Sequence, residues 1–299
     1  MSFCSDIKDK ISNADELSPC CVHAFYYGLI SFAHFSKFNL SITTEHRNLY
    51  DFYRNILKEY IGVDTKETDP NAKKLTAYVK SDKDKKKVFE KFGHDINETS
   101  QRINHANFEN ECCVASFLRG AFLACGNISD PNSGYHLEFV VPFKRLSGDL
   151  IKILSEIGLE AKYIVRKGCH IVYFKDSESI EDLLAYIGAQ DASLYLMNVK
   201  IEKDIKNRVN RKLNFEMSNL DKILSASNAQ IEAIHYIMSE GGLNLIPENL
   251  RELASLRLEN PDASLSELGE MTGNTISRSG IKHRLDKIVE IAEKMKEKS

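Results

Sequence analysis

The sequence contains no run of about 18 apolar residues, the length that marks a candidate membrane-spanning helix. Its first ten residues, MSFCSDIKDK, lack the apolar core of a secretory signal peptide. Cysteine occurs seven times, an odd number, and no export signal accompanies it. These absences argue against a membrane protein and predict a reduced protein of the cytoplasm, with no membrane partner.

An excess of positive charge is also missing, since the formal net charge is −3. The charge is nevertheless unevenly distributed. Lys73 to Lys91 contains eight Lys against three acidic residues, and Lys200 to Lys212 contains six Lys and Arg against two. Each run is compatible with a solvated face and with a surface that meets nucleic-acid phosphates, and the pattern alone does not separate these interpretations.

The first 190 residues contain an internal repeat. A shift of 92 residues places Cys20-Cys21 on Cys112-Cys113, Phe25 on Phe117, Gly28 on Gly120, Ile30 on Phe122 and Ala33 on Cys125. The 299 residues are enough for two domains. We therefore expect residues 1–93 and 94–190 to be two halves of one pseudo-two-fold α+β domain.

Similar elements are expected after each copy of the repeat. In the first half they are an extended run Phe38–Thr43, a helix Glu45–Tyr60, extended runs Ile61–Glu67 and Lys73–Lys80, and a helix Lys83–Gly93. In the second half they are a strand Tyr135–Val141, a helix Phe143–Ile157, a hairpin of Ala161–Arg166 and His170–Phe174 joined by Lys167-Gly168-Cys169, and a helix Ile180–Ile187.

Gly28 and Gly120 occupy equivalent positions in the middle of the two repeated apolar helices. A glycine inside a helix costs up to ~1 kcal/mol relative to alanine. That cost is tolerated where two helix backbones approach closely, because no Cβ stands between them. We expect the two helices to cross at these glycines.

Four cysteines occur as two adjacent pairs, Cys20-Cys21 and Cys112-Cys113. Four thiolates are a zinc ligand set, but zinc sites usually space their ligands two to four residues apart. Free cysteine is among the most buried residue types and packs as a small apolar side chain. The sequence therefore favours core cysteines, and neither a metal nor another cofactor is expected.

The second apolar helix ends in a nine-residue stretch, Leu118 to Gly126, that resembles the LAGLIDADG motif of homing endonucleases. The resemblance implies that the two repeated helices pack together and that each delivers a metal-binding carboxylate at its end. Leu123 and Cys125 stand where the motif has its two acids, and Ala33 is the equivalent of Cys125 in the first half. Neither Ala33 nor Cys125 is a hard-oxygen ligand, so no catalytic residue is expected. No His or Asn supports Cys125 as a nucleophile.

Residues 191–299 are predicted to be entirely helical apart from their connecting turns. Residues 191–220 are expected to form a linker helix, with Arg208, Arg211 and Lys212 as possible contacts to the DNA backbone. Residues 221–299 are expected to form a helix-turn-helix domain. In this domain a helix Lys222–Ser239 is expected to be capped by Asn219–Asp221 and stopped by Gly241-Gly242, and Pro247 is expected to open a further helix. The helix-turn-helix itself is predicted by a capping box Ser264–Glu267, a turn Thr272–Asn274, and Ser277 as the cap of the last helix.

The last helix carries basic residues on the side away from its apolar face. The predicted DNA-contacting residues are Arg278, Ser279, Lys282, His283, Arg284 and Lys287. A basic helix on an otherwise acidic domain is typical of a helix that docks on DNA. A plain helical bundle with an amphipathic last helix is the alternative.

Several motifs together resemble the WhiA family of bacterial regulators. They are Phe117–Ala124 with Gly126, Asp130-Pro131, Tyr135–Glu138, Asn207-Arg208, Asn219–Lys222, Ala263–Gly269, Ser277–Gly280 and His283–Leu285. The resemblance implies a degenerate LAGLIDADG domain fused to a helix-turn-helix similar to region 4 of sigma factors. It implies promoter binding in sporulation, cell division or chromosome segregation, by a nucleoid-associated monomer. A WhiB-type protein and an RNA polymerase sigma factor are the partners that it suggests.

Three functions are compatible with these features of the sequence. The first is a sequence-specific transcriptional regulator without catalysis, which the motifs favour. The second is an adaptor whose first domain binds a sigma factor or another regulator. The third, an active homing-type endonuclease, is disfavoured by Ala33 and Cys125.

Overall fold

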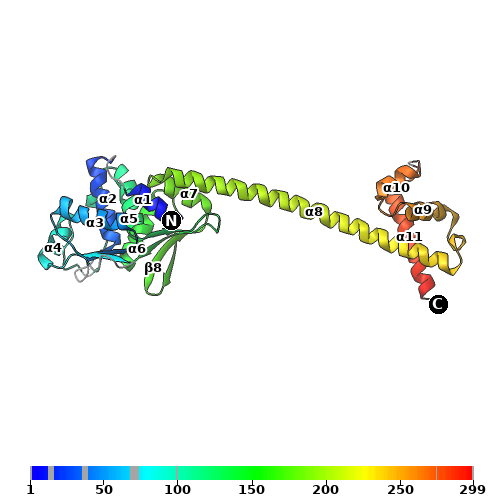
Figure 1. Ribbon diagram of the computed structural model, residues 1–299, viewed down its shortest axis with the longest axis horizontal. Coiled ribbons are helices and arrows are strands. Elements are labelled where there is room, and N and C mark those ends of the chain that lie inside the picture. The colour runs from blue at the N-terminus through cyan, green and yellow to red at the C-terminus, as the bar shows by residue number, and fades with distance from the viewer. Residues whose placement is uncertain are drawn as a thin grey trace. The chain divides into compact units, whose positions relative to one another are not determined.

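The computed structural model describes residues 2–12, 17–35, 40–67, 74–98, 100–273 and 275–297 (Figure 1). The chain forms two compact units, Met1–Lys203 and Asp204–Ser299, which are described separately. Phe38 and Lys73, at the start of two predicted strands, and Asn274, in the predicted turn, lie outside the described residues.

Unit 1 consists of two halves with the same order of elements. The first contains α1 (Phe3–Ile11), α2 (Pro19–Phe32), β1 (His34–Phe35), β2 (Leu40–Thr44), α3 (Arg47–Asn55), a π-helix (Ile56–Ile61), β3 (Lys66–Glu67), β4 (Leu75–Tyr78) and α4 (Asp82–Lys91). The second contains a 3₁₀ turn (His105–Asn107), α5 (Cys112–Cys125), β5 (Gly126–Ile128), β6 (Leu137–Val141), α6 (Lys144–Glu156), β7 (Lys162–Arg166), β8 (Cys169–Phe174) and α7 (Ser177–Tyr186).

Each half builds one antiparallel sheet, and the two sheets have the same topology. Their strand orders are β1-β2-β4-β3 and β5-β6-β8-β7. In both sheets the first strand follows directly from the apolar helix, since β1 begins two residues after α2 and β5 begins where α5 ends. The predicted pseudo-two-fold α+β domain is therefore confirmed.

Several boundaries in unit 1 differ from the predictions by a few residues, β1 and β5 were not predicted, and two of the differences have a clear cause in the backbone. The extended run expected at Ile61–Glu67 is strand only at Lys66–Glu67, because the preceding helix continues as a π-helix to Ile61 and stops at Gly62, where φ is 75°. In the hairpin, β8 begins at Cys169, so the turn has two residues. Lys167 and Gly168 both have positive φ, 51° and 79°, as the type I′ turn of a two-residue hairpin requires.

The core of unit 1 is organised around α2 and α5, which pack against each other at their glycines. A Cβ added at Gly28 would overlap the carbonyl oxygen of Phe117 and lie 3.1 Å from the amide nitrogen of Ala121. A Cβ added at Gly120 would overlap the carbonyl oxygen of Phe25 and lie 2.7 Å from the amide nitrogen of Leu29. The two backbones therefore touch directly, and each glycine fills the same place on its own helix.

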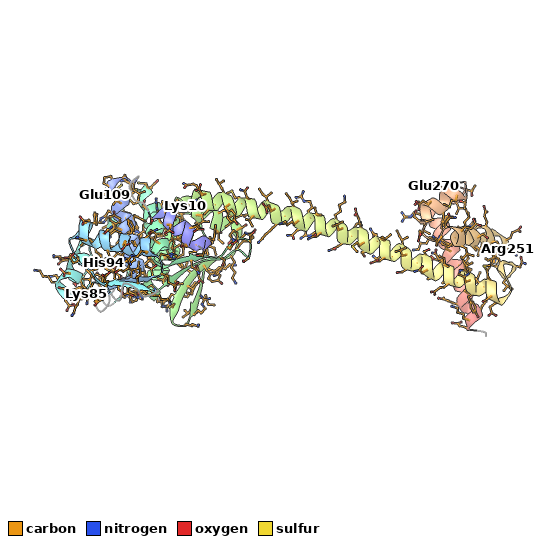
Figure 2. All side chains as sticks on the ribbon, in the orientation of Figure 1. Lys10, Lys85, His94, Glu109, Arg251 and Glu270 are labelled. Carbon is orange, nitrogen blue, oxygen red and sulfur yellow. The ribbon has the colours of Figure 1, made fainter. Side chains whose placement is uncertain are left out.

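The long helix α8 (Gln190–Glu240) replaces two predicted helices. The break expected at Asn219–Asp221 does not occur, so the prediction of a separate helix Lys222–Ser239 is wrong. No glycine or proline lies between Gln190 and Glu240, so the sequence contains no residue that must stop the helix. It ends at Gly241-Gly242, as predicted, and every residue from 204 to 226 is exposed (Figure 2).

Unit 2 contains the end of α8, a 3₁₀ turn (Leu243–Leu245), α9 (Glu248–Glu259), α10 (Leu265–Met271) and α11 (Arg278–Lys296). Its core joins these helices through buried aliphatic side chains, among them Ile234, Ile237, Leu253, Leu268, Ile281, Leu285 and Ile288. The prediction of an all-α helix-turn-helix domain after the α+β domain is confirmed.

The glycine crossing predicts a large effect of one methyl group. We expect Gly120→Ala to lower the free energy of unfolding by about 1–3 kcal/mol or more, because the Cβ has no space between the two backbones. Gly148→Ala in α6 is the matched control. Its Cβ meets nothing within 4 Å, so it should leave stability unchanged or raise it by up to ~1 kcal/mol. Urea denaturation measures both; equal stabilities for the two variants would contradict the crossing.

Candidate nucleic-acid interface

Local hydrogen bonds fix the helix-turn-helix of unit 2. Ser264 Oγ accepts from the backbone N–H of Glu267 at 3.2 Å, and the Glu267 carboxylate accepts from the N–H of Ser264 at 2.7 Å. This is the predicted capping box. Ser277 caps α11 by accepting from the N–H of Gly280 at 3.2 Å. Both helices therefore begin at the residues that the sequence indicates.

The first turns of α11 present polar side chains to the solvent. Arg278, Ser279, Lys282 and His283 are all exposed, whereas Ile281 and Leu285 on the opposite face are completely buried. Arg278, Ser279 and Lys282 also line a hollow of about 470 Å³ that they share with α8 and α10. The arrangement offers two cations and hydrogen-bonding groups on one accessible face, which suits phosphate and base-edge contacts.

Two further predicted contact residues are engaged within unit 2. Arg284 is partly buried, and its Nη1 donates to the carbonyl oxygen of Asn249 at 3.2 Å. Lys287 is exposed but lies 2.9 Å from the Glu290 carboxylate. Arg284 thus connects α11 to α9, and both side chains have less freedom to meet a ligand than Arg278 or Lys282.

The predicted backbone contacts on α8 are all exposed. Arg208, Arg211 and Lys212 lie in the stretch of α8 in which no residue is buried, and Lys212 Nζ lies 3.9 Å from the Glu216 carboxylate. Exposed ion pairs of this kind contribute little to stability. These side chains remain available for phosphates, although their position also fits an ordinary solvated helix.

Arg257 is a charged residue of the hollow that is not among the predicted contact residues. Its side chain is 2 % exposed and lines the hollow with Arg278 and Lys282. Its guanidinium donates to the carbonyl oxygens of Ala263 at 2.7 Å and of Asn260 and Pro261 at 3.4 Å, and Nε has no partner among the described residues. Burial lowers its pKa. The sequence feature that indicates a buried arginine here is the position of Arg257 inside the apolar run Leu253–Leu258.

The structure also shows what occupies the LAGLIDADG acid positions. Ala33 caps the end of α2, Cys125 is the last residue of α5, and both line a cavity of about 410 Å³ between the two sheets' first strands. None of the described residues that line this cavity is a carboxylate. Leu123, at the motif's other acid position, is completely buried in the core.

A lysine lies beside the end of α5. Lys8 of α1 donates from Nζ to the carbonyl oxygen of Leu123 at 3.1 Å, and burial lowers its pKa. A cation at this place interacts favourably with the C-terminal end of the helix. Burial raises the pKa of Cys125 to about 12, and Lys8 opposes only part of that shift. The Cys125 thiol is therefore protonated at neutral pH and is a poor nucleophile.

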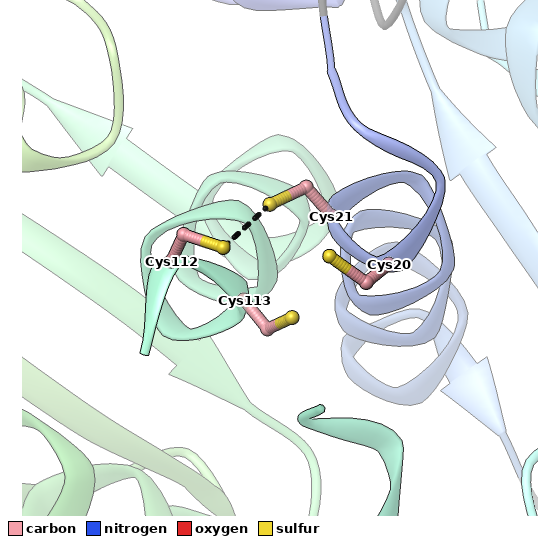
Figure 3. A group of neighbouring side chains, drawn as sticks. All are labelled: Cys20, Cys21, Cys112 and Cys113. Atoms are coloured by element: carbon pink, nitrogen blue, oxygen red, sulfur yellow. Dashed lines mark hydrogen bonds between the residues drawn. The ribbon is translucent and has the colours of Figure 1, made fainter. Parts of the chain in front are cut away.

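The four paired cysteines meet at the beginning of α2 and α5 (Figure 3). The Sγ atoms of Cys20, Cys21, Cys112 and Cys113 all lie within 4.8 Å of one another. Cys21 and Cys113 are buried, but Cys20 is half-buried and Cys112 is exposed. The prediction that all four are core residues is therefore wrong for Cys112. Residue spacing could not reveal this cluster, because it depends on how the two helices cross.

The fold and these sites define the class of protein: a two-fold LAGLIDADG-like domain followed by a helix-turn-helix domain. Family models give the same division. The WhiA LAGLIDADG-like domain matches residues 114–206, and the WhiA C-terminal HTH domain matches residues 209–292. The chain belongs to the WhiA family, as its motifs indicate.

Similar proteins match along nearly the whole chain. A "probable cell division protein WhiA" of Alkaliphilus metalliredigens is 36 % identical over 100 % of both chains. One of Clostridium botulinum is 38 % identical over 87 % of this chain and 86 % of the relative. The crystal structure of full-length DUF199/WhiA from Thermatoga maritima covers 98 % of this chain and 99 % of its own, with a TM-score of 0.58 and 24 % identity, and thus shares the fold.

In the part of the chain that the structure describes, no helix combines the length and the apolar character that crossing a bilayer requires.

The raised pKa of Cys125 predicts how its alkylation depends on pH. The thiolate is the reactive form, so the rate of labelling by iodoacetamide should still rise about tenfold per pH unit between pH 8 and pH 10. A thiol with the usual pKa of about 8.5 approaches a plateau in this range, and glutathione serves as that control. Peptide mass spectrometry measures the rate at Cys125. A plateau below pH 9 would restore Cys125 as a candidate nucleophile.

Proposed function

We propose that the protein is a sequence-specific transcriptional regulator that binds promoter DNA through α11 and acts in cell division, sporulation or chromosome segregation. The observation that carries the proposal is the exposed basic face of Arg278, Ser279, Lys282 and His283 at the start of α11. Relatives named for cell division and the matched helix-turn-helix family support a DNA-binding regulator. A cytoplasmic, nucleoid-associated location follows from this role.

Charge placement supports the proposed orientation on DNA. The helix-turn-helix architecture places the start of its second helix in the major groove, and here that start carries Arg278 and Lys282. Arg208, Arg211 and Lys212 are proposed to meet phosphates outside the groove. The net charge of −3 does not oppose this, because phosphate contacts depend on local cations.

The DNA-binding proposal predicts the effect of two substitutions. Lys282→Ala with His283→Ala should weaken binding to promoter fragments at least about tenfold, because base and phosphate contacts are each worth about 1–3 kcal/mol. The slope of log affinity against log salt should fall by about one for each lost phosphate contact. Gel-shift titrations at several salt concentrations, on fragments recovered by chromatin immunoprecipitation, measure both effects.

Lys294→Ala is the matched control, since it removes one cation from the far end of the same helix. The DNA affinity of this variant should stay within about twofold of that of the unmodified chain, because Lys294 lies away from the proposed contact face. Undiminished binding by the Lys282 and His283 variant would refute this placement of the interface.

A protein-binding role for unit 1 is the second candidate. Strand β7 is an edge strand whose five residues are all exposed, including Tyr163, Ile164 and Val165 at 42 %, 51 % and 54 %. Exposed apolar edges are places where other chains add. A sigma factor or a WhiB-type protein is the proposed kind of partner. In the same gel-shift series, a fragment of residues 204–299 that binds like the full chain would assign DNA reading to unit 2.

We also propose that unit 1 does not cleave DNA. Metal-assisted cleavage needs carboxylates that hold divalent ions at the scissile phosphate, and Ala33 and Cys125 provide none. Supercoiled plasmid incubated with the full chain and Mg²⁺ or Mn²⁺ should remain uncut, whereas an active LAGLIDADG endonuclease on its own target is the positive control. Cutting that requires the metal and persists through purification would overturn the proposal.

A further inference from the structure

Four thiol groups from two segments that are far apart in the sequence converge where α2 and α5 begin. Cys20 and Cys21 lie in the first turn of α2, and Cys112 and Cys113 open α5 (Figure 3). All four Sγ atoms lie within 4.8 Å of one another, and those of Cys21 and Cys112 are 3.3 Å apart. It is the only such group of metal-ligating side chains found among the described residues.

The spacing of the sulfur atoms fits one tetrahedral ion. A Zn–S bond of about 2.3 Å places tetrahedral sulfurs ~3.8 Å from one another. The most widely separated sulfurs therefore need to approach by about 1 Å at most, and those of Cys21 and Cys112 need to separate by about 0.5 Å, which are adjustments on the scale of side-chain rotation. A disulfide would join only two of them, at about 2.05 Å. Soft thiolates select zinc over magnesium or calcium, which take oxygen ligands.

The pseudo-two-fold symmetry removes the objection to adjacent ligands. A single Cys-Cys pair on one helix cannot surround an ion. Here each pair supplies one side, and the close approach of the two backbones at Gly28 and at Gly120 holds the helices near enough for the pairs to face each other. Adjacent cysteines argue against a metal site that is built from one segment of the chain. They do not argue against a site to which each of two segments contributes a pair.

Two helix ends and two polar side chains surround the sulfur atoms. Both helices direct the free N–H groups of their first turns, and the positive end of the helix dipole, toward this end. Ser18 Oγ lies 3.3 Å from Cys20 Sγ, and Asn110 Nδ2 donates to the same sulfur at 3.6 Å. Hydrogen bonds of this kind orient metal-bound thiolates.

We propose that Cys20, Cys21, Cys112 and Cys113 bind one zinc ion in a closed four-thiolate site that fastens the two halves of unit 1 together. Binding converts the thiols to thiolates, and their protons leave to the solvent. No open position remains on the ion, so its role is structural. The ion reaches the site from the solvent at the exposed Cys112 and the half-buried Cys20, and the buried Cys21 and Cys113 bind it from the interior side. The proposal reverses the expectation from the sequence.

Zinc content of the full chain tests the proposal. Protein purified with a reducing agent and no chelator should contain one equivalent of zinc by inductively coupled plasma mass spectrometry. Cys112→Ser and Cys21→Ser should each lose most of it. Cys4→Ser and Cys169→Ser, outside the cluster, are the matched controls and should keep it. Replacement by Co²⁺ should give the thiolate charge-transfer and tetrahedral ligand-field bands in the unmodified chain and both controls.

Chelation supplies a readout that needs no substitution. Removing zinc from the unmodified chain should lower its melting temperature, and added zinc should restore it, so the test holds even if Cys21→Ser fails to fold. Four free thiols without metal, a mass loss from a Cys21–Cys112 disulfide, or stoichiometric iron would each overturn the proposal. Equal zinc loss in Cys169→Ser would do the same.

Discussion

The direct contact between the backbones of α2 and α5 is the constraint on which unit 1 depends. Gly28 and Gly120 leave no space for a side chain, so the helices cross at one point and at one separation. This contact joins the two halves of the repeat into one domain. Each sheet continues directly from its own helix, so the contact between the helices also sets the positions of the two sheets. It also determines which residues meet at the two ends of the helix pair, namely the four cysteines at the beginnings and Ala33 with Cys125 at the other ends.

The packing function of the LAGLIDADG motif and its chemical function are thus separable. Packing requires small residues where the helices cross, and both glycines are present. Chemistry requires carboxylates at the helix ends, and those positions hold a methyl group and a thiol. The half-buried Lys8 lies beside Cys125, and its ammonium group donates to the Leu123 carbonyl oxygen at the end of α5. The end of α5 is therefore compatible with a stable fold although its acid positions hold no carboxylate.

The sequence could predict those features that depend on spacing along the chain. The shift of 92 residues identifies the two halves, and Ser264, Glu267 and Ser277 identify where helices of unit 2 begin. Features that depend on distance across the fold were missed. The cysteine cluster follows from the crossing, and the contact of Arg284 with Asn249 follows from how α11 packs on α9. The unbroken α8 was missed because Asn219 and Asp221 resemble a cap, although no residue there forces the helix to stop.

Net charge is a weak guide to what unit 2 binds, because the positions of its charges depend on how the chain folds. Its acidic residues are distributed over several helices, and Glu290 is held by two lysines, which lower its pKa to about 2. The cations of the first turns of α11 instead share one face with the hollow that they line, where the buried Arg257 adds positive charge and Asp286 is the one acidic residue among the described lining residues. A phosphate that approaches this face meets the local cations within a Debye length of about 8–10 Å. The proposed recognition therefore depends on where the charges lie, and in unit 2 the exposed cations lie at the start of α11, the helix that the helix-turn-helix architecture directs toward a DNA groove.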